Sequence, residues 1–158
     1  MTQLTPYQIY DLLNRQRPLW LVKIDLSDAS LWLVDLSGSD LSWANLSRSD
    51  LSRATLIRTN LTRANLTGAN LNLSNLFEAT LARARMTRIK LQRADLNKAR
   101  LDGANLQDAD LSGADLTGAR LERANLSKAL LTQTDLSKAN LAGAIMSENS
   151  RPVIGEMR

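Results

Sequence analysis

Leucine or methionine occupies every fifth position of the chain from Leu21 to Met146, without an insertion. In an α-helix, residues five apart are rotated by about 140°, so these side chains would spiral around all faces. In a flat strand, side chains alternate between two faces, so successive leucines would point in opposite directions. All of them can point inward only if the chain turns a corner about once per five residues. The pattern therefore predicts a solenoid and excludes a long amphipathic helix.

The positions around each leucine follow a pattern of their own. Two positions before it the residue is small, as at Ala64, which suits a narrow, close-packed interior. The position directly before it is mostly Asp or Asn, as at Asp40 and Asn45, whose side chains bond readily to nearby backbone at corners. The residue directly after the leucine is often Ser or Thr, and the next one, the fifth of the unit, is commonly Gly, Arg, Lys or Asp. We expect the three polar positions, one before and two after the leucine, to face water. One unit departs from the pattern, because Met86 and the bulky Ile89 predict a widened or bulged coil.

Several units read Ala-Asn-Leu-Thr-Gly (64–68), Ala-Asp-Leu-Ser-Gly (109–113) or Ala-Asp-Leu-Thr-Gly (114–118). In these units the chain resembles the pentapeptide-repeat proteins, a family common in bacteria and especially in photosynthetic ones. The resemblance covers most of the chain and implies an all-β fold, a right-handed quadrilateral β-helix with four units per coil. Residues twenty apart would then stack on one face, and coils about 4.8 Å apart would build a rod on the order of 30 Å long.

The two ends of the chain lack the repeat, so we expect three segments. These are an N-terminal helical cap over 1–18, the β-helix over 19–148, and a C-terminal tail or cap over 149–158. The sequence Thr-Pro-Tyr-Gln at 5–8 is typical of a helix start, with Thr as N-cap and Pro at the first helical position. It predicts a short helix over about 6–15.

A bare terminal coil exposes both its core and its strand edges, so we expect this helix to cover the first coil. Two apolar sets are available for that contact: Tyr7, Tyr10 and Leu13, or Ile9 and Leu12. A helix that docks onto a partner is the alternative interpretation.

The composition argues against catalysis. The chain has no histidine and no cysteine, which excludes Ser-His-Asp and Cys-His sites, histidine-ligated metals and disulfides. Asp95, Asp115 and Asp135 would share one face and could hold a hard cation, but we interpret them as corner residues that bond backbone and water. We therefore predict that the protein is not an enzyme and has no catalytic, cofactor or metal site.

Surface charge points to a binding face. Lys and Arg outnumber Asp and Glu by 20 to 16. Stacking by twenty places three arginines in one row, with a tryptophan at its end and two arginines beside it: Arg63, Arg83, Arg123, Trp43, Arg100 and Arg120. Such a face would attract an anionic partner, whereas a solvated surface that keeps the rod soluble is the alternative.

Apolar residues at outward positions form a second candidate surface in the first half of the rod. They are Trp32, Leu33, Trp43, Ile57, Leu73 and Phe77. Large apolar side chains beside arginine are typical of the centres of protein interfaces. The alternative is that the N-terminal helix covers some of them.

We predict a non-catalytic protein-binding or scaffold module with an unidentified, acidic protein as partner. The candidate partner-binding residues are Trp32, Leu33, Trp43, Ile57, Arg63, Phe77, Arg83, Arg100, Arg120 and Arg123. The family resemblance implies an alternative, that of the fluoroquinolone-resistance proteins that imitate DNA and occupy gyrase. That role needs a strongly negative surface, whereas this chain is basic and has a leucine core. We do not expect nucleic acid as a ligand, because the few aromatic residues are not interleaved with the basic ones.

Met1 to Gln8 do not read as a signal peptide, and no apolar run approaches the length of a membrane span. A cytoplasmic location is the default, which a removed export segment would overturn. Relatives in the family sometimes dimerise end to end, and the outward positions of Leu130 and Ile145 leave both a monomer and such a homodimer open.

Overall fold

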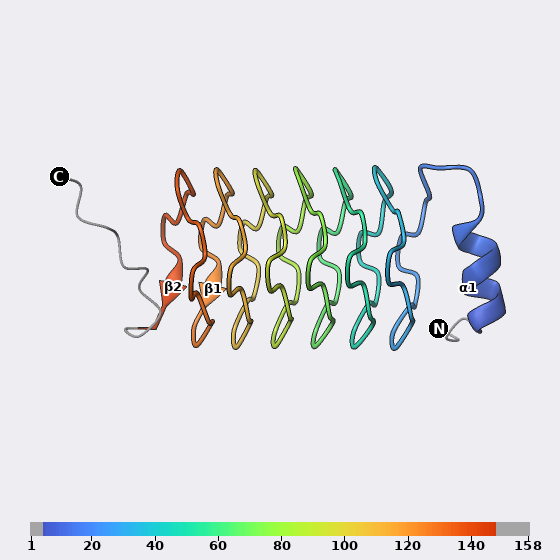
Figure 1. Cartoon of the computed structure of the whole chain (residues 1–158), viewed down its shortest axis with the longest axis horizontal. Coiled ribbons are helices and arrows are strands. Elements are labelled where there is room, and N and C mark those ends of the chain that lie inside the picture. Colours follow the sequence, from blue (N-terminus) through green and yellow to red (C-terminus); the bar gives the residue numbers. More distant parts are fainter. Residues whose placement is uncertain (1–4, 148–158) are drawn as a thin grey trace.

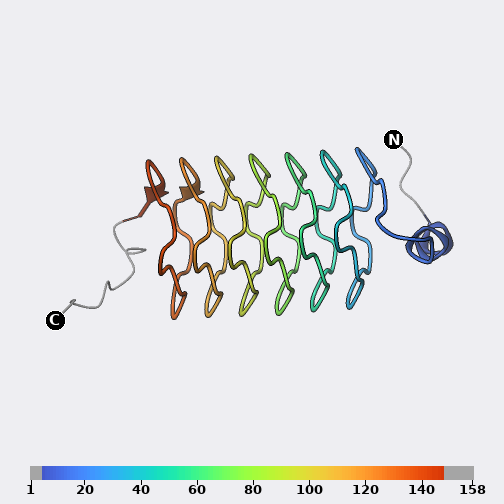
Figure 2. The same ribbon diagram turned by 90° about the horizontal axis from the view of Figure 1, so that it is seen from above.

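The computed structural model describes residues 5–147. The chain forms the predicted right-handed quadrilateral β-helix, a rod of stacked coils with one helix, α1 (Pro6–Leu13), at its N-terminal end (Figure 1). The same regular stack is seen after a rotation of 90° (Figure 2), so the rod keeps its cross-section along its length.

Each coil takes twenty residues, because every residue before a leucine pairs in parallel with the residue twenty positions later. These bridges run from Trp20↔Asp40 to Arg120↔Asn140. The pairing extends to two residues in β1 (Asn125–Leu126) and β2 (Ile145–Met146), the two strands at the C-terminal end. Each side of a coil is therefore a very short strand, and each corner begins at the next leucine.

The corners are type II turns. At one of them the Ala64 N–H donates to the Leu61 carbonyl at 3.0 Å, and Arg63 between them has a φ of 59°. A positive φ at the third residue of a turn favours glycine, because it has no Cβ. The fifth position of the repeat has a positive φ at every corner from Lys23 to Gly143, which explains the glycines found there.

Asp and Asn side chains brace these corners as the sequence predicts. Asp25 Oδ1 accepts the Ser27 N–H at 3.0 Å and the Ser27 hydroxyl at 2.7 Å. Asn45 Oδ1 accepts the Ser47 N–H at 3.3 Å, and Asn45 Nδ2 donates to Asp25 Oδ1 at 3.0 Å in the coil before it. The hydrogen bonds from the Ser27 hydroxyl and N–H hold the pKa of Asp25 below its usual value.

The interior is a column of leucines flanked by small residues. Leu66, Leu96 and Leu116 are fully buried, and full burial of one leucine contributes roughly 1.5–3 kcal/mol. The predicted widening at Met86 and Ile89 is wrong. Both side chains are buried, and the Met86 N–H donates to Asn105 O at 2.8 Å as in other coils, so methionine and isoleucine fit the same bore.

Helix α1 begins where the sequence predicts and ends two residues earlier, at Leu13. Thr5 Oγ1 accepts the Gln8 N–H at 3.3 Å, and Gln8 Oε1 accepts the Thr5 N–H at 2.9 Å, which completes a capping box. Ile9, Leu12 and Leu13 pack against the core, whereas the two tyrosines of the helix are exposed. Ile9 and Leu12 therefore cover the first coil together with Leu13, the one member of the other set that packs there. The tail predicted over 149–158 lies outside the described residues.

Candidate protein-interaction surface

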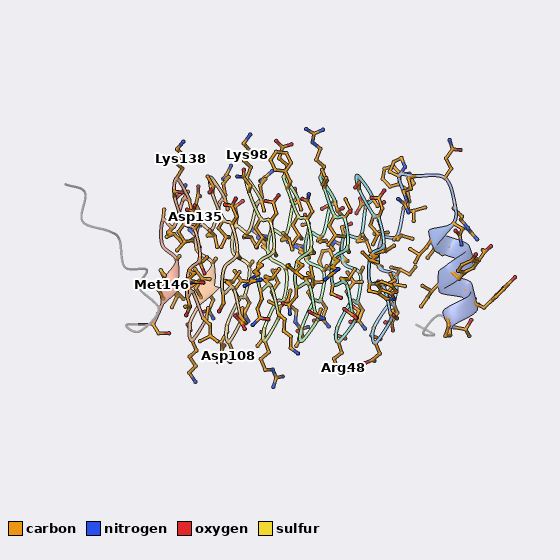
Figure 3. The ribbon with its side chains drawn as sticks, in the orientation of Figure 1. Arg48, Lys98, Asp108, Asp135, Lys138 and Met146 are labelled. Carbon is orange, nitrogen blue, oxygen red and sulfur yellow. The ribbon has the colours of Figure 1, made fainter. Side chains whose placement is uncertain are left out.

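The four corners of the rod differ in chemistry. The first corner comprises residues 20, 22 and 23 and their equivalents at intervals of twenty along the chain. The second corner comprises residues 25, 27 and 28, the third residues 30, 32 and 33, and the fourth residues 35, 37 and 38, each again with the equivalents at intervals of twenty. Corner side chains point away from the rod: Lys98 and Lys138 project from the fourth corner, and Arg48 and Asp108 project from the opposite edge (Figure 3). Each corner is thus a narrow outward strip of residues that the coil spacing holds in register.

Charge is uneven between these strips. The basic side chains of the first corner are Lys23, Arg63, Arg83, Arg100, Arg120 and Arg123, against Asp40, Asp102 and Glu122. The fourth corner shows the reverse, with Arg58, Lys98 and Lys138 against Asp35, Glu78, Asp95, Asp115 and Asp135. The first corner therefore has an excess of positive charge and the neighbouring fourth corner an excess of negative charge.

The structure brings the predicted arginine row together on the first corner. The Arg63 guanidinium lies over the Trp43 ring, 4.6 Å from its centroid, in a cation–π contact. Arg83 and Arg123 form no ion pair with the residues that the structure describes. A Cβ at Gly103 would lie 3.6 Å from Cγ of Arg83, so the Arg83 side chain leans over this glycine toward the following coil.

Arg100 and Arg120 stand beside the row and share a carboxylate that sequence analysis missed. Arg100 Nε lies 3.6 Å from Asp102 Oδ2, and Arg120 Nε lies 3.4 Å from Asp102 Oδ1. Both oxygens are buried and accept no hydrogen bond within the described chain. Arg120 Nη2 also lies 3.5 Å from Glu122 Oε1. Asp102 is thus enclosed by the two guanidinium groups, and the twenty-residue spacing of Arg100 and Arg120 was the sequence signal for it.

The N-terminal end of the first corner is aromatic. Trp20 is 79% exposed and Trp43 is 51% exposed. Val22, at a repeat position between those of the two tryptophans, is also exposed. Sequence analysis missed Trp20 because it precedes the first repeat leucine. Its stacking with Asp40 places it on the same corner as the arginine row.

The other apolar candidates do not form one cluster. Trp32 and Leu33 lie on the third corner and are more than half exposed, so α1 does not cover them. Ile57 and Phe77 lie side by side on the fourth corner, as predicted, where the Arg58 N–H donates to Phe77 O at 2.9 Å. The prediction of a single apolar patch is therefore wrong. Each five-residue unit moves the chain to the next corner, so these side chains are distributed over three corners.

The aspartates of the fourth corner act as corner braces. Asp95 Oδ1 accepts the Asn97 N–H at 2.9 Å, and Asp115 Oδ1 accepts the Thr117 N–H at 2.8 Å. The hydrogen bonds from the Ser137 hydroxyl and N–H lower the pKa of Asp135 in the same way. Between residues 5 and 147, no three acidic side chains are arranged to hold a metal ion. No helix in that range has the length and hydrophobicity needed to cross a membrane.

The repeating unit, its four-sided coil and its braced corners define the class of protein. The chain belongs to the pentapeptide-repeat family, whose model, described as pentapeptide repeats, matches in 8 copies. The matched segments are 21–53, 35–72, 54–93, 74–113, 84–123 and 109–148.

Several solved structures are similar to this chain, among them those of two cyanobacterial proteins. HetL from Nostoc sp. strain PCC 7120, a pentapeptide-repeat protein involved in heterocyst differentiation regulation, is 34% identical, with 86% of this chain and 78% of HetL covered and a TM-score of 0.52. Rfr23 from Cyanothece 51142 is 30% identical, with 73% and 88% covered and a TM-score of 0.45. QnrB1, a plasmid-mediated fluoroquinolone resistance protein, is 18% identical in a trypsin-treated form, with 83% and 91% covered and a TM-score of 0.36. A search of curated proteins gave no match.

Proposed function

We propose that the protein is a non-catalytic binding or scaffold module that recognises an acidic protein through its first corner. The observation that carries the proposal is the row of Arg63, Arg83 and Arg123 on the most basic strip of the rod, with Arg63 stacked on Trp43. Arginine and tryptophan are, with tyrosine, the residues most enriched among those that dominate interface energies. We expect the module to act in the cytoplasm.

The rigidity of the rod supports this role. Each arginine of the row lies at a turn whose backbone is fixed by a turn hydrogen bond and by a bond to the next coil, as at Arg63, whose N–H donates to Ala82 O at 3.0 Å. A surface that is ordered before binding loses less conformational entropy on association. A partner with carboxylates at matching intervals would therefore bind without rearranging the backbone.

The charge of the corners argues against a DNA mimic. Such a protein presents dense negative charge along its surface, whereas the first corner is basic and the fourth corner mixes lysine and arginine with its aspartates. Protein recognition through the arginine row accounts for the distribution of charge more directly.

The test is co-purification from host lysate at physiological salt, with the variant Arg63→Glu, Arg83→Glu, Arg123→Glu. The matched control is Arg53→Glu, Arg88→Glu, Lys128→Glu, which changes the charge equally at the same repeat position on the second and third corners. None of these six side chains forms an ion pair with the described residues, so the two variants differ in corner and in the contact of Arg63 with Trp43. Circular dichroism confirms that both fold.

The proposal predicts a protein that is captured by wild type and by the control variant and lost from the first-corner variant. Equal capture by both variants would overturn it, because the location of the charge would then be irrelevant.

A further inference from the structure

The first corner changes character along the rod. Its N-terminal end presents Trp20, Val22 and Trp43, all exposed, and its C-terminal half presents Arg83, Arg100, Arg120 and Arg123. Arg63 joins the two parts, since it stacks on Trp43 at 4.6 Å. A ligand that uses both parts must lie lengthwise and must carry apolar groups at one end and negative charge at the other.

We infer that the partner contributes an extended protein segment to this corner, with large apolar side chains against Trp20 and Trp43 and carboxylates against the arginines from Arg83 to Arg123. The inference rests on the proposed function and names the chemistry of the partner's binding segment.

The dimensions fit a short segment. Stacked coils lie about 4.8 Å apart, so the five coil steps from Trp20 to Arg120 span about 24 Å. An extended chain rises about 3.3 Å per residue, so about seven residues cover this distance. The segment therefore has room for one or two apolar residues and several acidic ones.

Asp102 positions two of the receiving arginines. It faces Arg100 and Arg120 through their Nε atoms, at 3.6 and 3.4 Å, and Arg100 makes no other ion pair within residues 5–147. The two Nη atoms of Arg100 therefore remain available for a carboxylate, and arginine binds carboxylates through such paired N–H groups. A guanidinium that is already held loses less freedom when the partner binds.

The same cluster disfavours a nucleic acid. Asp102 and Glu122 stand among the arginines, so the continuous negative charge of a phosphate backbone would meet like charge there. The tryptophans are confined to one end and do not alternate with the arginines, so they give no platform for successive bases. Separated carboxylates on a protein segment fit the alternation of charge better.

The test uses the full chain and a fluorescently labelled eight-residue peptide of two leucines followed by three glutamate–serine pairs, with fluorescence anisotropy as readout. Control probes replace the leucines with serines, replace the glutamates with lysines, or substitute a single-stranded oligonucleotide of equal charge. The variant Trp20→Ala, Trp43→Ala is compared with Trp32→Ala, which removes a tryptophan that is 59% exposed on the third corner.

We expect wild type to bind the leucine–glutamate peptide at least tenfold more tightly than the serine or lysine probe. The Trp20 and Trp43 variant should lose at least tenfold in affinity, and Trp32→Ala less than twofold. Asp102→Asn raises the net charge and would strengthen binding if charge alone acted. If Asp102 instead positions Arg100 and Arg120, the variant should lose several-fold in affinity for the peptide at unchanged melting temperature.

Tighter binding of the oligonucleotide than of the peptide would overturn the inference, as would equal losses from the two tryptophan variants. Absence of peptide binding by wild type would also overturn it. If the arginine variant still lost its lysate partner in that case, the proposed function would stand, whereas failure of both experiments would remove both.

Discussion

The first and last coils of the rod share one sequence pattern and differ in burial. The central leucines of the first coil, Leu21, Leu26, Leu31 and Leu36, are all at most 3% exposed. Their counterparts in the last coil, Leu131, Leu136, Leu141 and Met146, are only partly buried. Helix α1 packs on the first coil through Ile9, Leu12 and Leu13. The repeat thus determines where each side chain points, and packing against a neighbouring element such as α1 increases how much of it is buried.

The largest expected effect compares Leu31→Ala with Leu131→Ala, two positions in the same column. Removal of the fully buried Leu31 side chain should cost about 2–5 kcal/mol of unfolding free energy, because it leaves a cavity. Leu131→Ala should cost about 1 kcal/mol, since the side chain already meets solvent and the site can relax. Urea unfolding measures both, and equal losses would mean that the two coils are equally packed.

The second prediction removes the cap. Ile9→Ser with Leu12→Ser should weaken the first coil by about 2 kcal/mol, because two partly buried side chains lose their contact with the core. Hydrogen exchange followed by mass spectrometry should then show faster exchange over 21–40 and unchanged exchange over 61–110. The control, Tyr7→Ser with Tyr10→Ser, changes exposed residues of the same helix and should leave both ranges unchanged.

The third prediction concerns the strained corners. Gly103 and Gly143 lie in one column with φ of 65° and 68°, a conformation that a β-branched residue resists. Gly103→Val should lower stability by about 1–2 kcal/mol. Gly143→Val should lower it by about half as much, because the last coil can open without the rest. Thermal unfolding distinguishes the two, and a larger loss at Gly143 would contradict the comparison.

The smallest effect is on pH dependence. The folded-state pKa of Asp25 is lowered, first by the Ser27 hydroxyl, so its carboxylate stabilises the fold above its unfolded pKa of about 3.9. This stabilisation is lost as pH falls through the lower, folded pKa. Asp25→Asn keeps an acceptor oxygen, as Asn45 does in the next coil, so its melting temperature should fall less than that of wild type between pH 6 and pH 3.

Asp135 in the last coil is the counterpart for this experiment. The Ser137 hydroxyl lowers its pKa in the same direction. Asp135→Asn should alter the acid dependence of the melting temperature less than Asp25→Asn, since the last coil contributes less to the cooperative unit. An effect of Asp135→Asn as large as that of Asp25→Asn would show that the last coil unfolds together with the first.

Much of this fold follows from the sequence alone. A five-residue period with one leucine per unit admits few chain paths, and the Asp or Asn before each leucine marks the corners. The column of Asp25 and Asn45 follows directly from the period of twenty. Helix α1 was predicted from its capping residues, because Thr5 and Gln8 act locally.

The candidate site was only partly predictable. The arginine row follows from spacing, but the pairing of Asp102 with Arg100 and Arg120 depends on how long side chains bend between coils. Trp20 lies before the first repeat leucine, so the pattern did not include it. Apolar residues near one another in sequence, such as Leu33 and Trp43, lie on different corners because each five-residue step moves the chain to another corner.

One measurement tests most directly whether a single corner is the interface. A photo-crosslinking amino acid is placed in turn at Thr62, Thr67, Asn72 and Phe77, which occupy the same partly buried slot on the four corners of consecutive units. After irradiation of host cells, we expect a crosslinked partner from position 62, beside Arg63, and none from 67, 72 or 77. Crosslinks of equal yield from the other corners, or a partner captured only from one of them, would contradict this expectation.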